Sequence, residues 1–165
     1  MRSALIEVIG LAEEKRVQIS LEIDEVVPMV EADAALQVEA ISSVIRNAIE
    51  ATPEQGKLAL ALTAPVSRRG VCFSVEDSGL GIRAQVFEPF FSHKPAGTGL
   101  GLSIARGIVQ GHGGSIRIAA SAHGGDALHI QLPPGAAEKL SCPADPVSIA
   151  DITDERSTGL ATGEA

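Results

Sequence analysis

Two glycine clusters, twenty residues apart, carry the clearest chemical signal in the sequence. The first reads Asp77-Ser78-Gly79-Leu80-Gly81, and the second reads Gly97-Thr98-Gly99-Leu100-Gly101-Leu102. Alternating glycines let backbone N–H groups approach a ligand, because no Cβ stands in the way. The second cluster runs directly into an apolar helical pattern, which would bring free N–H groups and the positive end of a helix dipole together. That combination favours a phosphate site.

The spacing of these glycines excludes the two commoner phosphate loops. The sequence contains no G-x-x-x-x-G-K-[ST] motif, and Gly97-x-Gly99-x-Gly101 does not match G-x-G-x-x-G. Asp77 adds a complementary group, because a carboxylate can accept a hydrogen bond from an exocyclic amine such as that of adenine. Each cluster alone is equally typical of a turn-rich surface loop, so its meaning depends on the motifs around it.

Two further motifs complete an ordered set. Residues 43–51 read Ser-Val-Ile-Arg-Asn-Ala-Ile-Glu-Ala, and residues 87–95 read Phe-Glu-Pro-Phe-Phe-Ser-His-Lys-Pro. Together with the glycine clusters they closely resemble the N, G1, F and G2 boxes of the catalytic ATP-binding domain of bacterial sensor histidine kinases, in the GHKL superfamily. The nitrogen-regulation and oxygen-sensing kinases are the most similar subgroup. The resemblance covers about residues 1–134 and implies the Bergerat ATP-binding fold.

The resemblance also implies a site for ATP and Mg²⁺. Asn47 would hold the metal through its amide oxygen, which suits Mg²⁺, and Asp77 would accept from the adenine amine. Lys94 would neutralise phosphate charge and, with Asn47, would form the catalytic pair. The implied nucleotide-binding set is Asn47, Asp77, Gly79, Gly81, Ile82, Lys94, Gly97, Thr98, Gly99, Leu100, Gly101 and Leu102. The alternatives are a solvated helix Asn, an Asp that caps a turn and an exposed Lys.

In such kinases the γ-phosphoryl group passes to a histidine on a dimerisation domain and then to a response regulator. Nothing in the sequence resembles the H box that carries this histidine, so the resemblance implies a fragment of a longer kinase or a module that acts in trans. A protein-serine kinase of the anti-sigma type shares the fold and is one alternative. A degenerate, non-catalytic docking scaffold is another.

The sequence departs from the family pattern at three places. Ser43 replaces the first Asn of the N box, which argues against fast hydrolysis, although Glu39 and Glu50 remain possible bases. The segment 83–86 between the boxes is short, which predicts a short ATP lid. Asp126-Ala127 stands where relatives carry a Thr pair in the last strand, and this change could weaken the adenine contacts.

Composition narrows the function classes. A net charge of −8 argues against a nucleic-acid-binding module, which needs a basic surface. No apolar run approaches the length of a membrane span, so we expect no membrane contact by this segment and a cytoplasmic location. Cys72 and Cys142 have no metal-binding spacing, and Cys72 is expected to be a small core residue.

Histidine and phenylalanine residues add little chemistry. We assign no catalytic role to His93, and His112, in a His-Gly-Gly turn, is expected to cap a helix. His123 and His129 have no convincing partners for a metal or a triad. Three of the four Phe residues lie in residues 87–91, either as anchors of a functional loop or as simple attachments to the core.

The hydrophobic pattern predicts an α+β fold, a two-layer sandwich with a mixed sheet. Helices are expected at 3–14, at 34–51 after an Asp33 N-cap, and after Gly101 to about 110; strands are expected at 17–23, 28–30, 57–62, 71–75, 115–120 and 128–132. The helix at 34–51 would present one polar stripe, which contains Ser43, Asn47 and Glu50. Residues 78–98 form a long loop. Residues 135–165 have few large apolar side chains and are expected to form a flexible acidic tail or linker.

Overall fold

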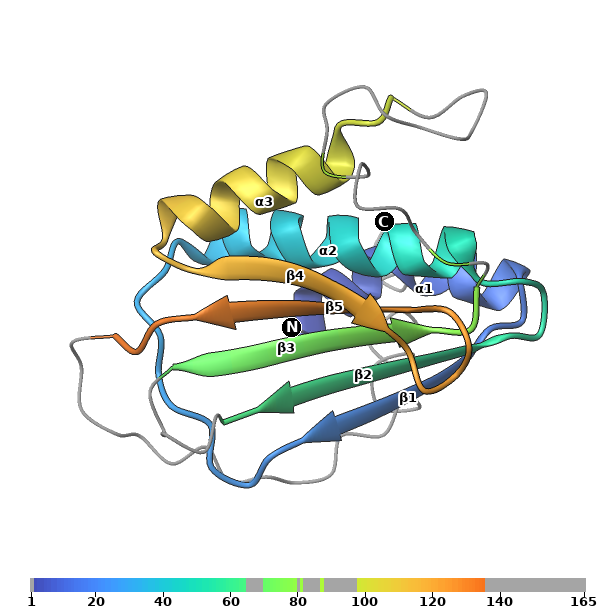
Figure 1. Ribbon diagram of the computed structural model, residues 1–165, viewed down its shortest axis with the longest axis horizontal. Helices are drawn as coiled ribbons and strands as arrows, with labels where there is room; N and C mark the ends of the chain where they lie inside the picture. The colour runs from blue at the N-terminus through green and yellow to red at the C-terminus, as the bar shows by residue number, and fades with distance from the viewer. Residues whose placement is uncertain (1, 65–69, 80, 82–86, 88–97, 136–165) are drawn as a thin grey trace, which may run out of the picture.

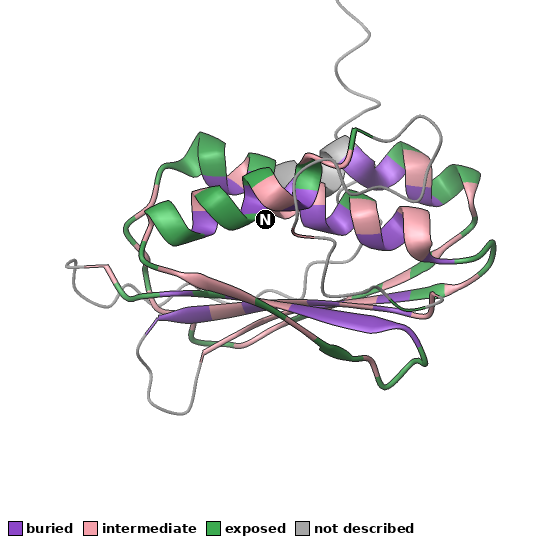
Figure 2. Ribbon diagram, turned by 45° about the horizontal axis from the view of Figure 1, so that its top comes forward, coloured by how far each residue is buried: buried purple, intermediate pink, exposed green. Residues whose placement is uncertain are grey.

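The computed structural model describes residues 2–64, 70–79, 81, 87 and 98–135. These residues form a layer of helices on one face of a five-stranded sheet (Figures 1 and 2). The elements are α1 (Arg2–Glu14), β1 (Gln18–Ile23), α2 (Ala34–Ala51), β2 (Lys57–Thr63), β3 (Val71–Asp77), α3 (Gly101–Gly111), β4 (Ser115–Ala120) and β5 (Asp126–Leu132). The expected two-layer α+β sandwich is therefore confirmed.

The sheet is mixed, and its order is β1-β2-β3-β5-β4. β1 runs parallel to β2, whereas the β2–β3, β3–β5 and β4–β5 pairs are antiparallel. The period-two pattern explains why the sheet has two unlike faces. In β3 the side chains of Val71, Phe73, Val75 and Asp77 are buried, and the residues between them are half-buried. The last buried position of β3 is thus occupied by a carboxylate.

The core lies between the helices and the sheet, where the buried residues gather in Figure 2. α2 supplies its centre, because Val44, Ile45, Ala48 and Ile49 have no exposed surface. From α3, Leu102, Ala105 and Val109 complete the buried stripe. The opposite side of α2 carries the polar stripe that the sequence predicted, with Ser43, Asn47 and Glu50 half-buried and Arg46 exposed. The apolar face of α2 therefore packs in the core, and its polar face remains accessible to a ligand.

Both ends of α2 are held by side chains. Asp33 Oδ1 accepts from the N–H groups of Ala35 and Leu36 at 2.9 and 3.0 Å, which confirms the expected N-cap. At the other end Lys15 Nζ donates to the carbonyls of Ile49 at 2.8 Å and Glu50 at 3.0 Å, and also to that of Thr52. A cation on the last carbonyls also suits the negative end of the helix dipole.

Two expectations were wrong. Residues 28–30 form no strand, because Pro28 has no N–H to donate. Within the part of the chain that the structure describes, this segment is joined to residue 135 by a single backbone bond, from Gly135 N to Met29 O at 3.0 Å. Cys72 lies on the sheet face away from the helices and is half-buried, so it is not a core residue. Burial still raises the pKa of its thiol.

Among the described residues, no helix has both the length and the apolar character of a membrane span.

Candidate functional site

Asp77 forms one end of the site, at the last residue of β3. Its side chain has no exposed surface. Oδ1 accepts from the N–H of Gly79 at 2.7 Å and, more weakly, from that of Asp126 at 3.4 Å. Oδ2 is buried and has no partner. Burial raises the pKa of Asp77, and the two N–H groups oppose that shift. A buried acceptor without a donor is costly, so this oxygen fits an exocyclic amine.

Glycines permit the close packing around this carboxyl group. A Cβ on Gly79 would lie 2.7 Å from the carbonyl oxygen of Ala51, and one on Gly125 would collide with Asp77 Oδ1 and lie 2.5 Å from Gly79 N. Gly81 has a φ of +85°, a backbone conformation that residues other than glycine rarely adopt. Sequence reasoning named Gly79 and Gly81 but missed Gly125, whose only signal was the Gly124-Gly125 turn.

The start of α3 forms the other end of the site. Leu100 is the N-cap residue, and its side chain makes no capping hydrogen bond. Gly99, with a φ of +66°, turns the chain into the helix. The N–H groups of a first helical turn have no partners within the helix, so this end suits an anion. Thr98 and Gly101 are exposed there, whereas the Leu102 side chain is buried in the core and leaves only its backbone for a ligand.

α2 connects the two ends. A Cβ on Gly101 would lie 3.9 Å from Ser43 Cβ, and Gly79 packs against Ala51 at the end of α2. Asn47 lies midway, four residues from each, on the same polar stripe. Eight residues of helix span about 12 Å, which is comparable to the distance from the base to the terminal phosphate of a nucleoside triphosphate. The structure thus places Asn47 on α2 between the Asp77 end of the site, with Gly79, and the start of α3.

The other predictions from the sequence have mixed outcomes. Ile82, Lys94, Gly97 and most of the F box lie outside the described residues, as do His93, Phe90 and Phe91. Phe87 packs against the core, with the Arg106 guanidinium 5.6 Å from its ring centre. Ser103 Oγ donates to Leu100 O at 2.8 Å and so belongs to the helix, as expected. Within the described ranges, no group of three or more His, Cys, Asp or Glu residues could hold a metal ion.

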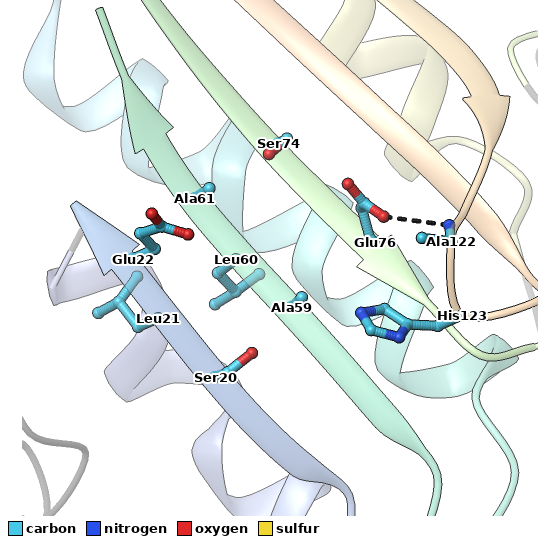
Figure 3. A pocket seen from close by; sticks show the side chains of 10 residues that line it. All are labelled: Ser20, Leu21, Glu22, Ala59, Leu60, Ala61, Ser74, Glu76, Ala122 and His123. Atoms are coloured by element: carbon cyan, nitrogen blue, oxygen red, sulfur yellow. Dashed lines mark hydrogen bonds between the residues drawn. The ribbon is translucent and has the colours of Figure 1, made fainter. Parts of the chain in front are cut away.

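A hollow of about 510 Å³ lies on the opposite face of the sheet, away from this site (Figure 3). Small residues of β1, β2 and β3 form its floor, and Glu22 and Glu76 stand on either side. Glu76 accepts from the N–H of Ala122 at 3.4 Å. Because Glu76 precedes Asp77 on β3, the two carboxylates point to opposite faces, and the hollow is separate from the glycine clusters.

Comparison with known proteins agrees with this geometry. The family described as "Histidine kinase-, DNA gyrase B-, and HSP90-like ATPase" matches residues 32–136. Sensor histidine kinase ZraS of Escherichia coli (strain K12) is 34% identical over 126 residues, which cover 74% of this chain and 27% of the relative. The chain therefore spans about a quarter of that curated relative.

Solved structures agree in fold. The nucleotide-free catalytic domain of histidine kinase ThkA has a TM-score of 0.71 and 31% identity, covering 81% of this chain and 91% of that one. Full-length ShkA in complex with AMPPNP also has a TM-score of 0.71, with 26% identity, and covers 87% of this chain and 30% of that one. The chain belongs to the histidine kinase-, DNA gyrase B- and HSP90-like ATPases, and within them to the ATP-binding catalytic domains of sensor histidine kinases.

Proposed function

We propose that this domain binds Mg·ATP along the polar stripe of α2 and transfers the γ-phosphoryl group to a histidine of a dimerisation domain. The observation that best supports this proposal is the placement of α2 between the two glycine clusters. Ala51 packs against Gly79 at the Asp77 end, and Ser43 lies beside Gly101 at the start of α3. The base would lie at Asp77 and the phosphates at α3.

Asn47 is the residue that we propose for the metal. Mg²⁺ prefers oxygen ligands, keeps most of its waters and usually binds one or two protein groups together with substrate phosphates. The half-buried Asn47 lies midway along the polar stripe, one helical turn from Ser43, so its amide oxygen fits that requirement. A bound Mg²⁺ would neutralise charge on the phosphates.

The remaining roles follow the sequence-based assignments. Lys94 would act as a second cation at the phosphates, and Ile82 and Gly97 would complete the nucleotide contacts. We assign catalysis to positioning and charge neutralisation, because a neutral imidazole is already a competent nucleophile. The acceptor histidine would belong to a longer chain in cis or to a partner in trans, and a response regulator would receive the phosphoryl group in the cytoplasm.

Calorimetric titration with a non-hydrolysable ATP analogue, with and without Mg²⁺, is the first test. Binding that Mg²⁺ strengthens is expected, and no binding at millimolar analogue would leave a docking scaffold instead. The second step offers the domain ATP together with a histidine-bearing helical hairpin or a serine-bearing protein. Acid-labile phosphate on the hairpin supports the histidine kinase, whereas acid-stable phosphate on the serine protein would overturn it in favour of the serine-kinase alternative.

A further inference from the structure

Lys15 follows α1 directly, and its side chain reaches the end of α2. Its ammonium group donates to the carbonyl oxygens of Ile49 at 2.8 Å and Glu50 at 3.0 Å, and also to that of Thr52. A lysine ammonium has three N–H donors and no acceptor, so these three carbonyls match its full donor capacity. The last carbonyls of a helix have no partners within the helix, and a cation suits them. Lys15 therefore uses its whole head group on one short stretch of backbone.

The backbone of the same residue holds the turn that follows α2. The carbonyl oxygen of Lys15 accepts from the N–H of Gln55 at 3.0 Å. Gln55 has a φ of +60°, a left-handed conformation that residues other than glycine seldom adopt and that persists only where the surroundings enforce it. Within the turn, Gly56 N donates to Pro53 O at 3.0 Å. Lys15 thus contacts both the last turn of α2 and the residues after it.

The first glycine cluster packs against this stretch of backbone at two places. A Cβ on Gly79 would lie 2.7 Å from the carbonyl oxygen of Ala51, and one on Gly56 would lie 2.9 Å from Ser78 Oγ. Ser78 Oγ also accepts from the N–H of Lys57 at 2.9 Å, and Ser78 N donates to Lys57 O at 3.1 Å. Because these segments are packed so closely, a shift of the end of α2 must move the glycine cluster as well.

The glycine cluster in turn orients Asp77. Its Oδ1 accepts from Gly79 N at 2.7 Å, and its side chain has no exposed surface. The position of Gly79 therefore sets the direction of the buried Oδ2, the oxygen without a partner. A binding group must be held within about 0.5 Å of its productive position to be effective. The contacts run without a break from Lys15 through Ala51 and Gly79 to the Asp77 carboxyl group.

We propose that Lys15 is a positioning residue of the nucleotide site, which acts through the end of α2 and holds Gly79 and Asp77 in place for the base. This inference rests on the proposed function, since it requires a nucleotide at Asp77. α1, which contributes none of the proposed nucleotide contacts, thereby acts on one end of the site. The start of α3 lies beside Ser43, about 12 Å along α2 from Ala51, so it should keep its geometry when Lys15 is changed.

The test compares Lys15→Met with Lys57→Met in the full chain. Methionine keeps most of the unbranched apolar stem of lysine and removes the three donors. Lys57 is exposed at the start of β2, close to the same glycine cluster. Its replacement gives the same change in net charge and so controls for long-range attraction of the anionic nucleotide. Lys15→Arg keeps the charge, but its planar fork does not converge on three carbonyls as an ammonium does, so a partial rescue is expected.

Two measurements are made on each protein. In the nucleotide-free chain, amide hydrogen exchange by NMR follows the N–H of Gly79, which is bonded to Asp77 Oδ1, and that of Val75, which is buried in the central strand and reports global unfolding. In Lys15→Met, exchange at Gly79 should rise by about tenfold more than exchange at Val75. Calorimetric titration should show that the affinity for Mg·AMPPNP falls about tenfold in Lys15→Met, about threefold in Lys15→Arg and hardly in Lys57→Met.

Equal acceleration at Gly79 and Val75 would mean that Lys15 only stabilises the fold, and equal losses of affinity in Lys15→Met and Lys57→Met would mean that only charge matters. Either result overturns the inference. If the wild-type chain binds no AMPPNP, the proposed function fails and the inference with it. If wild type binds and Lys15→Met binds equally well, the inference fails alone. If Lys15→Met does not fold, Lys15→Arg carries the test, since it too should speed exchange at Gly79 more than at Val75.

Discussion

The His112 ring at the end of α3 accepts a hydrogen bond through Nε2 from the backbone N–H of Asp33, 3.0 Å away at the start of α2. Nδ1 of the same ring lies 2.8 Å from Ile108 O and donates to it, which fixes one neutral tautomer. His112 therefore has the capping role that the sequence predicted. It also ties together the two helices that line the candidate site.

Replacing His112 should loosen this connection. His112→Leu leaves the Asp33 N–H and the Ile108 carbonyl without their side-chain partner, and it should lower the free energy of unfolding by about 1 to 2 kcal/mol. Urea denaturation followed by circular dichroism measures the change. His123→Leu is the matched control, because His123 is exposed in the turn before β5. Equal effects of the two substitutions would argue against the link.

Asn47→Ala should separate metal dependence from folding. Without the amide oxygen, Mg²⁺ should no longer strengthen nucleotide binding, and we expect a loss of about tenfold or more in the affinity for Mg·AMPPNP, or at least 1.4 kcal/mol. The melting temperature should hardly change, since Asn47 lies on the polar stripe. Arg46→Ala, at an exposed neighbouring position, is the control. An Asn47→Ala chain that keeps the full Mg²⁺ enhancement would remove Asn47 from the site.

Gly125→Ala should distort the Asp77 end of the site through a steric clash. The new methyl group would collide with Asp77 Oδ1 and lie 2.5 Å from Gly79 N, so backbone must shift. We expect a loss of about 2 to 4 kcal/mol in stability and weaker nucleotide binding. Gly107→Ala is the control, because its methyl group meets no atom within 4 Å in α3. It should stabilise the helix by up to about 1 kcal/mol, and equal behaviour of the two variants would contradict the packing argument.

The two buried carboxyls, those of Asp77 and Asp126, also predict how stability depends on pH. Their pKa values are raised above the ordinary 3.8, so the folded chain binds protons more readily than the unfolded chain. Their favourable contribution is complete below about pH 3.8 and is lost as pH rises through the folded values. Asp126→Asn should therefore be more stable than wild type near neutral pH, by about 1 kcal/mol. That stability advantage should vanish in acid. Thermal unfolding of both proteins at several pH values measures it, and a stability difference that does not change with pH would contradict the prediction.

Local sequence patterns predicted most of this fold. Asp33 as an N-cap, the apolar stripe of α2 and the alternation of β3 depend on residues close in sequence, and each is confirmed. The same approach placed a strand at residues 28–30, since two apolar residues follow Pro28, and gave too little weight to the missing N–H. It also placed Cys72 in the core, because alternation alone does not say which sheet face the helices cover.

Contacts between distant segments could not be predicted in this way. Lys15 caps α2 across 34 to 37 residues, and His112 reaches Asp33 across 79 residues. The approach of Asp126 to Asp77 depends on the pairing of β3 with β5. The sequence marked Asp126 as a departure from relatives, but only the register of the strands shows that it completes a carboxyl pair.

The unequal ends of α2 and α3 have a consequence for how occupancy can be detected. Lys15 already caps the end of α2 nearest Asp77, whereas no side chain among the described residues caps the start of α3. A bound triphosphate would therefore serve as the missing N-cap of α3. Amide hydrogen exchange at residues 101–103 should slow on binding far more than exchange at the end of α2. Hydrogen exchange in the first turn of α3 would thus report phosphate binding independently of base recognition.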